Sequence, residues 1–209
     1  MKQIEQQITE IKKELEASPE NADLLNELGV GYHILGAYER AVETYRRSLA
    51  HDPGNFKTHF NLANTFFELR EIDRAVSHYL DALDLQPDYV PALNNLADLY
   101  ELADKKERAR ELFEHITKIN PDDAMAHFNL GNHYLRSNNS VEAGSCYKKA
   151  IELNPDFYEA YNNIGFILKH IEHYKEAIPY FEQCLEIDPD FKPAKRDLAA
   201  CRKELQRSS

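Results

Sequence analysis

The segment Phe56–Tyr89, FKTHFNLANTFFELREIDRAVSHYLDALDLQPDY, is one of five units of equal length that make up most of the chain. Its proline belongs to a series spaced 34 residues apart without insertion or deletion: Pro19, Pro53, Pro87, Pro121, Pro155 and Pro189. A fixed period of this length indicates a repeated helix–turn–helix unit. We therefore divide the chain into units at residues 22–55, 56–89, 90–123, 124–157 and 158–191, with positions in each unit numbered from its first residue.

Small and aromatic residues recur at fixed positions of these units. Position 8 is small in every unit (Gly29, Ala63, Ala97, Gly131 and Gly165), and position 20 is always alanine (Ala41, Ala75, Ala109, Ala143 and Ala177). Position 24 is always aromatic (Tyr45, Tyr79, Phe113, Tyr147 and Phe181). Positions 7, 8 and 11 share one helix face, and positions 20, 24 and 27 share a face of a second helix. We expect the small residues to let the two helices of a unit cross closely.

This pattern resembles the tetratricopeptide repeat (TPR) family, whose units read W-x2-L-G-x2-Y, then A-x3-F, then P. The resemblance covers residues 22–191 and departs from the pattern only at the tryptophan position, which holds Leu25, His59, Leu93, His127 and Tyr161. It implies an all-α, right-handed superhelical solenoid that forms a single domain. We expect residues 1–21 to form an amphipathic N-terminal helix and residues 192–209 a C-terminal capping helix. Aspartates that follow the prolines are expected to cap the next helices; they are Asp88, Asp122, Asp156 and Asp190.

Charge and composition exclude several classes of partner. The net charge of −11 disfavours nucleic acid, because phosphates would be repelled. No apolar run resembles a secretory signal or reaches the roughly 18–20 residues of a membrane span. Three cysteines without framework spacing, Cys146, Cys184 and Cys201, predict free thiols in a reducing, cytoplasmic setting. Residues 192–209 are basic, with a net charge of +4, which fits a solubilising cap or, alternatively, weak self-association.

The TPR resemblance also implies a concave groove lined by the first helix of each unit. Its candidate peptide-binding residues occupy positions 2, 5, 6 and 9 of the units: Asn61, Asn95, Asn129, Asn163, Asn64, Asn132, Phe60, Asn94, Phe128, Asn162 and Lys57. An asparagine amide offers both a donor and an acceptor, the pair that an extended peptide backbone needs. Asparagine is also common at these positions in generic TPR units, so the column can equally be family inheritance.

The predicted function is a protein–protein interaction scaffold that binds an extended peptide or a helix of a partner. Two alternatives stay open. One is a self-assembling structural scaffold, and the other is the targeting module of an enzyme complex, because the asparagine column resembles that in the TPR portion of O-linked GlcNAc transferase. A clamp for acidic chaperone tails is not expected, since only Lys57 and Asn61 match its basic and amide positions.

No catalytic motif is evident in the sequence, which lacks a phosphate loop and a serine-nucleophile motif. Two histidine pairs have spacings that could suit a metal, His170 with His173 and His127 with His133, but neither has an evident third ligand. His59 and His127 are interpreted as packing residues, because they replace the tryptophan of the repeat. We therefore expect neither a metal nor another cofactor.

Overall fold

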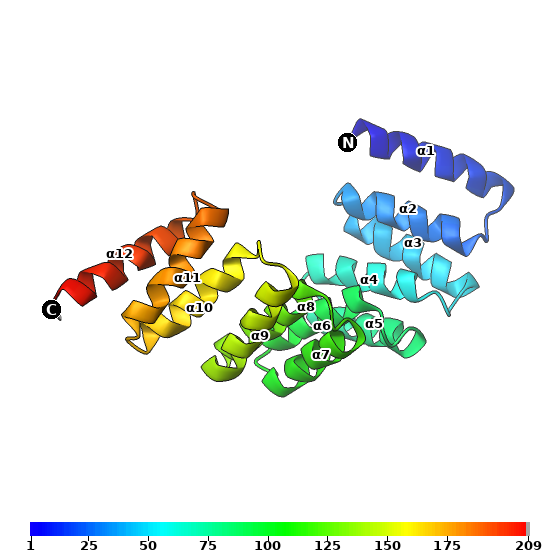
Figure 1. Cartoon of the computed structure of the whole chain (residues 1–209). Helices are drawn as coiled ribbons and strands as arrows, with labels where there is room; N and C mark the ends of the chain where they lie inside the picture. The colour runs from blue at the N-terminus through cyan, green and yellow to red at the C-terminus, as the bar shows by residue number, and fades with distance from the viewer. Residues whose placement is uncertain (208–209) are drawn as a thin grey trace. The chain divides into compact units, whose positions relative to one another are not determined.

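The computed structural model describes residues 1–207, and all regular secondary structure in this range is helical (Figure 1). The helices are α1 (Lys2–Ala17), α2 (Ala22–Ile34), α3 (Tyr38–His51), α4 (Phe56–Glu68), α5 (Ile72–Leu85), α6 (Val90–Leu102), α7 (Lys106–Ile119), α8 (Ala124–Arg136), α9 (Ser140–Leu153), α10 (Tyr158–His170), α11 (Tyr174–Ile187) and α12 (Lys192–Arg207). The predicted all-α fold is confirmed. Residues 208–209 of the predicted capping helix lie outside the described range.

The chain divides into two compact units, one from Met1 to Ala103 and the other from Asp104 onward. In the first unit, α2 packs on α3 and α4 packs on α5, while α1 lies against α2. A Cβ atom on Gly29 of α2 would lie 2.5 Å from the Tyr45 ring of α3, so this crossing requires a residue without a side chain. The position-20 alanines Ala41 and Ala75 are fully buried, as the pattern predicts.

In the second unit, the pairs α8 with α9 and α10 with α11 repeat this packing, and α12 covers α11. The rings of Tyr147 and Phe181 are fully buried against Gly131 and Gly165. Cys184 and Cys201 are fully buried in one apolar cluster between α11 and α12. All three cysteines are free, and burial raises the pKa of the Cys184 thiol to about 11, so that thiol stays protonated near neutral pH.

The prediction that the aspartates directly after the prolines cap the next helices was wrong by one residue. The N-cap residues of α6, α8 and α10 are Tyr89, Asp123 and Phe157, each two residues after the proline instead of one. Side-chain caps form where this position holds a suitable oxygen, as Asn55 does for α4 and Asp123 for α8. The residue before the proline stabilises the loop instead, and Asn154 Oδ1 accepts a hydrogen bond from the Asp156 amide.

The C-terminal helix α12 combines an apolar face with ion pairs to its own chain. Asp197 is 3% exposed and accepts hydrogen bonds from Lys169 Nζ at 2.9 Å and from Arg196 Nε at 3.0 Å. Arg202 of the same helix pairs with Glu182 of α11 at 2.7 Å. Two ion pairs therefore attach α12 to the helices that it contacts: Lys169 of α10 with Asp197, and Arg202 with Glu182 of α11. Across the described residues, no helix has the length and apolar character needed to cross a membrane.

Candidate functional site

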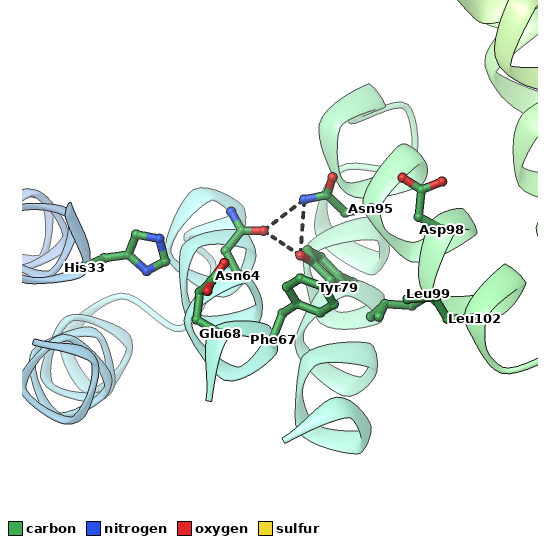
Figure 2. Close-up of a pocket in the computed structure, with 9 residues that line it drawn as sticks. All are labelled: His33, Asn64, Phe67, Glu68, Tyr79, Asn95, Asp98, Leu99 and Leu102. Carbon is green, nitrogen blue, oxygen red and sulfur yellow. Dashed lines mark hydrogen bonds between the residues drawn. The ribbon is translucent and has the colours of Figure 1, made fainter. Parts of the chain in front are cut away.

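An asparagine, a tyrosine and a second asparagine form a hydrogen-bonded triad on the first unit (Figure 2). The hydroxyl of Tyr79, on α5, donates to Oδ1 of Asn64, on α4. Nδ2 of Asn95, on α6, donates to the same oxygen at 2.9 Å and lies 3.1 Å from the tyrosine hydroxyl. The triad therefore joins position 9 and position 24 of one repeat to position 6 of the next.

The second unit contains the same triad two repeats later. Tyr147 donates its hydroxyl proton to Asn132 Oδ1 at 2.9 Å, and Asn163 Nδ2 donates to that oxygen at 3.2 Å. Four of the predicted groove asparagines thus bind one another through a buried tyrosine that the prediction did not include. The signal was present in the sequence, because these are the two repeats with asparagine at position 9 and tyrosine at position 24.

The remaining predicted amides are half-buried as well. Asn61 Nδ2 donates to Asn26 Oδ1 of the preceding repeat at 3.0 Å. Asn162 Nδ2 donates to Asn163 Oδ1 at 3.2 Å, while the Asn162 Oδ1 atom is buried without a hydrogen-bond partner among the described residues. Asn94 and Asn129 also have interaction partners. Asn61 therefore joins neighbouring repeats, as the triads do. A ligand would use the donor and acceptor capacity that the bonds between these amides leave.

The predicted apolar contacts, Phe60 and Phe128, pack mainly on aromatic residues of their own unit. The Phe60 ring lies 5.2 Å from Tyr89 and 5.9 Å from Tyr79. The Phe128 ring lies 4.6 Å from Phe157, in the corresponding loop of its repeat. Lys57 is exposed, and its ammonium lies 5.9 Å from the centre of the Phe56 ring. Both phenylalanines stay half-buried, so each keeps part of its surface open to solvent.

A pocket of about 360 Å³ opens beside the first triad. Figure 2 shows its lining residues, which come from α2, α4, α5 and α6: His33, Asn64, Phe67, Glu68, Tyr79, Asn95, Asp98, Leu99 and Leu102. Phe67, Leu99 and Leu102 supply apolar surface, and the triad supplies polar atoms. Glu68 and Asp98 make the pocket acidic, which suits a positively charged side chain better than an acidic one.

The histidine and the tyrosine of this pocket are held in their neutral forms near neutral pH. Burial lowers the pKa of His33, against the opposing charge of Glu68, and its Nδ1 lies 2.9 Å from the Thr65 hydroxyl. Burial also raises the pKa of Tyr79 to about 12, so the hydroxyl keeps its proton for Asn64. The pocket thus offers fixed dipoles and carboxylates, the elements of a binding surface.

The two histidine pairs singled out in the sequence serve packing and loop contacts. His127 Nε2 donates to the Pro121 carbonyl at 2.9 Å, whereas His133 is 2% exposed beside Phe113 and Tyr134. The His173 ring is exposed and lies 3.9 Å from Glu176. None of these four histidines belongs to a cluster of three possible metal ligands within the described part of the chain.

Comparison with known proteins agrees with this architecture. A family model described as the tetratricopeptide repeat protein 21 C-terminal ARM domain matches residues 55–194, which is more than half of the chain. A second model, described as a TPR repeat, matches residues 31–70. The chain is 48% identical to the BBSome complex member BBS4 of Bos taurus over 46 residues, a match that spans only 9% of that protein.

Solved structures extend the similarity to most of the chain. The crystal structure of MamA matches with 25% sequence identity and a TM-score of 0.70, covering 78% of this chain and 95% of that one. YrrB, described as a TPR protein with an unusual peptide-binding site, matches with 19% identity and a TM-score of 0.72 over 89% of this chain and 96% of its own. The similarity to YrrB supports the fold alone, because its sequence identity is low.

Proposed function

The chain belongs to the tetratricopeptide repeat family whose C-terminal ARM-domain model covers residues 55–194, and from this we propose that it is a protein-interaction scaffold. Its partner would be a protein segment, extended or helical, that binds the surface carrying the asparagine columns. The observation that carries this proposal is the acidic pocket beside the Asn64–Tyr79–Asn95 triad. The other predicted groove residues of the same compact unit, Lys57, Phe60, Asn61 and Asn94, would extend this contact along the segment.

The chemistry of the pocket favours a segment with a basic side chain. Glu68 and Asp98 would attract a lysine or arginine, while Phe67 and Leu99 would contact the methylene groups of that side chain. Asn95 would then bind the segment's backbone through the capacity left by its bond to Asn64. YrrB, which has the same fold, is described as a TPR protein with an unusual peptide-binding site, and peptide binding is therefore compatible with this fold.

A peptide selection tests the proposal. Peptides selected from a random display library on the full chain should be enriched in lysine or arginine and should bind with measurable affinity in solution. Asn95→Ala should weaken the binding of these peptides. Glu68→Gln should weaken the binding of peptides that contain a basic residue more than the binding of the same peptides with that residue replaced by alanine. Each contact is expected to be worth about 0.5–3 kcal/mol, the range for a net hydrogen bond to a neutral or charged group.

Asn139→Ala is the matched control, because Asn139 is an exposed loop asparagine that makes no side-chain cap bond. Its binding should equal that of the unchanged chain. Equal binding by the Asn95→Ala and Glu68→Gln variants, with helicity intact, would contradict the assignment of this pocket.

A non-catalytic role and a reducing compartment complete the proposal. Burial raises the pKa of both Cys146 and Cys184 to about 11, which makes these thiols poor nucleophiles near neutral pH. The ion pairs that join α12 to α10 and α11, Lys169 with Asp197 and Arg202 with Glu182, support a capping role for α12 over self-association. Sedimentation at low and high salt would separate the two roles, since a monomer under both conditions is expected of a cap.

A further inference from the structure

Two histidines and an aspartate converge between α4 and α5, and none of the three is among the residues that line the pocket beside the triad. His59 lies in the first turn of α4, at the tryptophan position of the repeat, and His78 and Asp81 lie one turn apart on α5. His59 Nδ1 is 3.2 Å from His78 Nδ1 and 3.4 Å from Asp81 Oδ2, and His78 Nδ1 is 3.1 Å from the same oxygen. Three potential ligand atoms thus form a nearly equilateral triangle.

The size of this triangle matches the coordination of a small transition-metal ion. Bonds of about 2.0–2.1 Å at tetrahedral angles separate neighbouring ligand atoms by about 3.3–3.4 Å. The observed separations of 3.1–3.4 Å therefore need only small side-chain rotations to receive such an ion. Imidazole nitrogen with carboxylate oxygen is a donor set suited to zinc, and three protein ligands leave one position for water.

The surroundings also orient the histidines for this task. His59 Nε2 lies 3.3 Å from the Pro53 carbonyl oxygen, which can only accept a hydrogen bond. Nε2 of His59 therefore carries the proton, and in the neutral ring Nδ1 presents its lone pair to His78 and Asp81. The His78 ring stacks on Phe66, with centroids 5.5 Å apart and an interplanar angle of 8°, which limits its rotation.

The arrangement is specific to one repeat. The fourth repeat has a histidine at the same position, His127, with the same hydrogen bond to a proline carbonyl. The positions that correspond to His78 and Asp81 hold Cys146 and Lys149 there. The bond to the proline carbonyl is therefore a feature of histidine at the tryptophan position, whereas the cluster of three ligand atoms is an additional feature of the second repeat.

We propose that His59, His78 and Asp81 bind one divalent transition-metal ion of the zinc class. The ion would join α4 to α5 within the second repeat and stabilise their pairing. Access is open, because the Asp81 side chain is 44% exposed whereas those of His59 and His78 are 14% and 25% exposed. The site differs from the two histidine pairs considered in the sequence, because those pairs lie in the fourth and fifth repeats.

Titration of the full chain with zinc chloride, after treatment with a chelator, tests the proposal. Calorimetry should show that the unchanged chain binds one equivalent of zinc. The affinity should fall at least tenfold in Asp81→Asn and in His59→Ala, because loss of a residue that only supports a metal ligand already costs about 10–100-fold, and these residues are the ligands themselves. Cobalt(II) should give the visible absorption of a tetrahedral nitrogen–oxygen site. Zinc should also raise the thermal midpoint of the unchanged chain more than that of Asp81→Asn.

His127→Ala is the matched control and should bind zinc as the unchanged chain does. Asp81→Asn keeps the shape of the side chain, so circular dichroism should show the same helicity as for the unchanged chain. This variant therefore tests the site even if His59→Ala proves unstable. Three outcomes would overturn the proposal: no saturable binding by the unchanged chain, equal affinity in Asp81→Asn, or loss of binding in His127→Ala, which would place the ion near Cys146 instead.

Discussion

At the scale of single residues, the tyrosine of each triad holds two asparagines of neighbouring repeats. Tyr79→Phe removes the donor to Asn64 Oδ1 and leaves that oxygen with Asn95 alone. We expect the free energy of unfolding to fall by about 0.5–1.5 kcal/mol, the net value of one hydrogen bond. Urea unfolding followed by circular dichroism measures it, and unchanged stability would mean that the triad contributes no net energy.

The buried carboxylate of α12 allows a second test at this scale. Burial alone would raise the pKa of Asp197, but hydrogen bonds from Arg196 and Lys169 outweigh it and hold the pKa below its usual value. Asp197→Asn should lower the free energy of unfolding by about 1.5–3 kcal/mol, as for a hydrogen bond to a charged group. Asp190→Asn is the control, since that side chain is 98% exposed beside Lys195 and such pairs are worth about 0–1 kcal/mol. Equal losses in both variants would contradict this view of α12.

At the scale of elements, the turn between the two helices of a repeat requires a left-handed residue at position 15. The first repeat has Gly36, with φ of +73°, whereas Arg70 and Glu172 adopt φ of 62° with side chains that disfavour it. Arg70→Gly and Glu172→Gly should raise the free energy of unfolding by up to about 1 kcal/mol each.

Asn138→Gly is the comparison for this prediction, because asparagine tolerates the left-handed region that Asn138 occupies with φ of 60°. Its gain should be smaller than that of Arg70→Gly in the same urea experiment. A loss of stability on Arg70→Gly would show that the glycine's greater freedom in the unfolded chain outweighs the relief of strain.

At the scale of the whole molecule, stability should depend on pH at both ends of the range. Burial raises the pKa of Tyr79 and of Tyr147 from 10.0 to about 12, so the unfolded chain loses these protons first. Stability is thus expected to fall as pH rises from about 10 to about 12. Burial lowers the pKa of His33 and His78 below 6.5, so the unfolded chain binds more protons and stability falls as pH drops below that value.

Urea unfolding between pH 5 and about pH 11, with a chelator present throughout, measures this profile. Tyr79→Phe should flatten part of the alkaline decline. A stability that stays constant above pH 10 would contradict the burial of these hydroxyl groups.

The sequence by itself determined the repeat and its packing. The proline spacing predicts where one repeat ends and the next begins, and the small residues at positions 8 and 20 predict a close crossing inside each helix pair. The structure contains the helix boundaries and the close crossings. They succeed because a repeated unit must bury the same faces every time, so that the periodicity encodes both the helices and their crossing. The prediction placed the helix caps one residue too early, because the N-cap position depends on the residue at which the loop backbone turns into the helix.

Only the tertiary structure decided what the polar residues do. The asparagine columns were visible in the sequence, but their bonding through Tyr79 and Tyr147 depends on how each second helix places its tyrosine between two first helices. The convergence of His59, His78 and Asp81 likewise joins residues on two helices whose approach no single-helix spacing records. A helical period fixes which face a side chain occupies, whereas the atoms that it meets across a helix crossing depend on the distance and angle of that crossing.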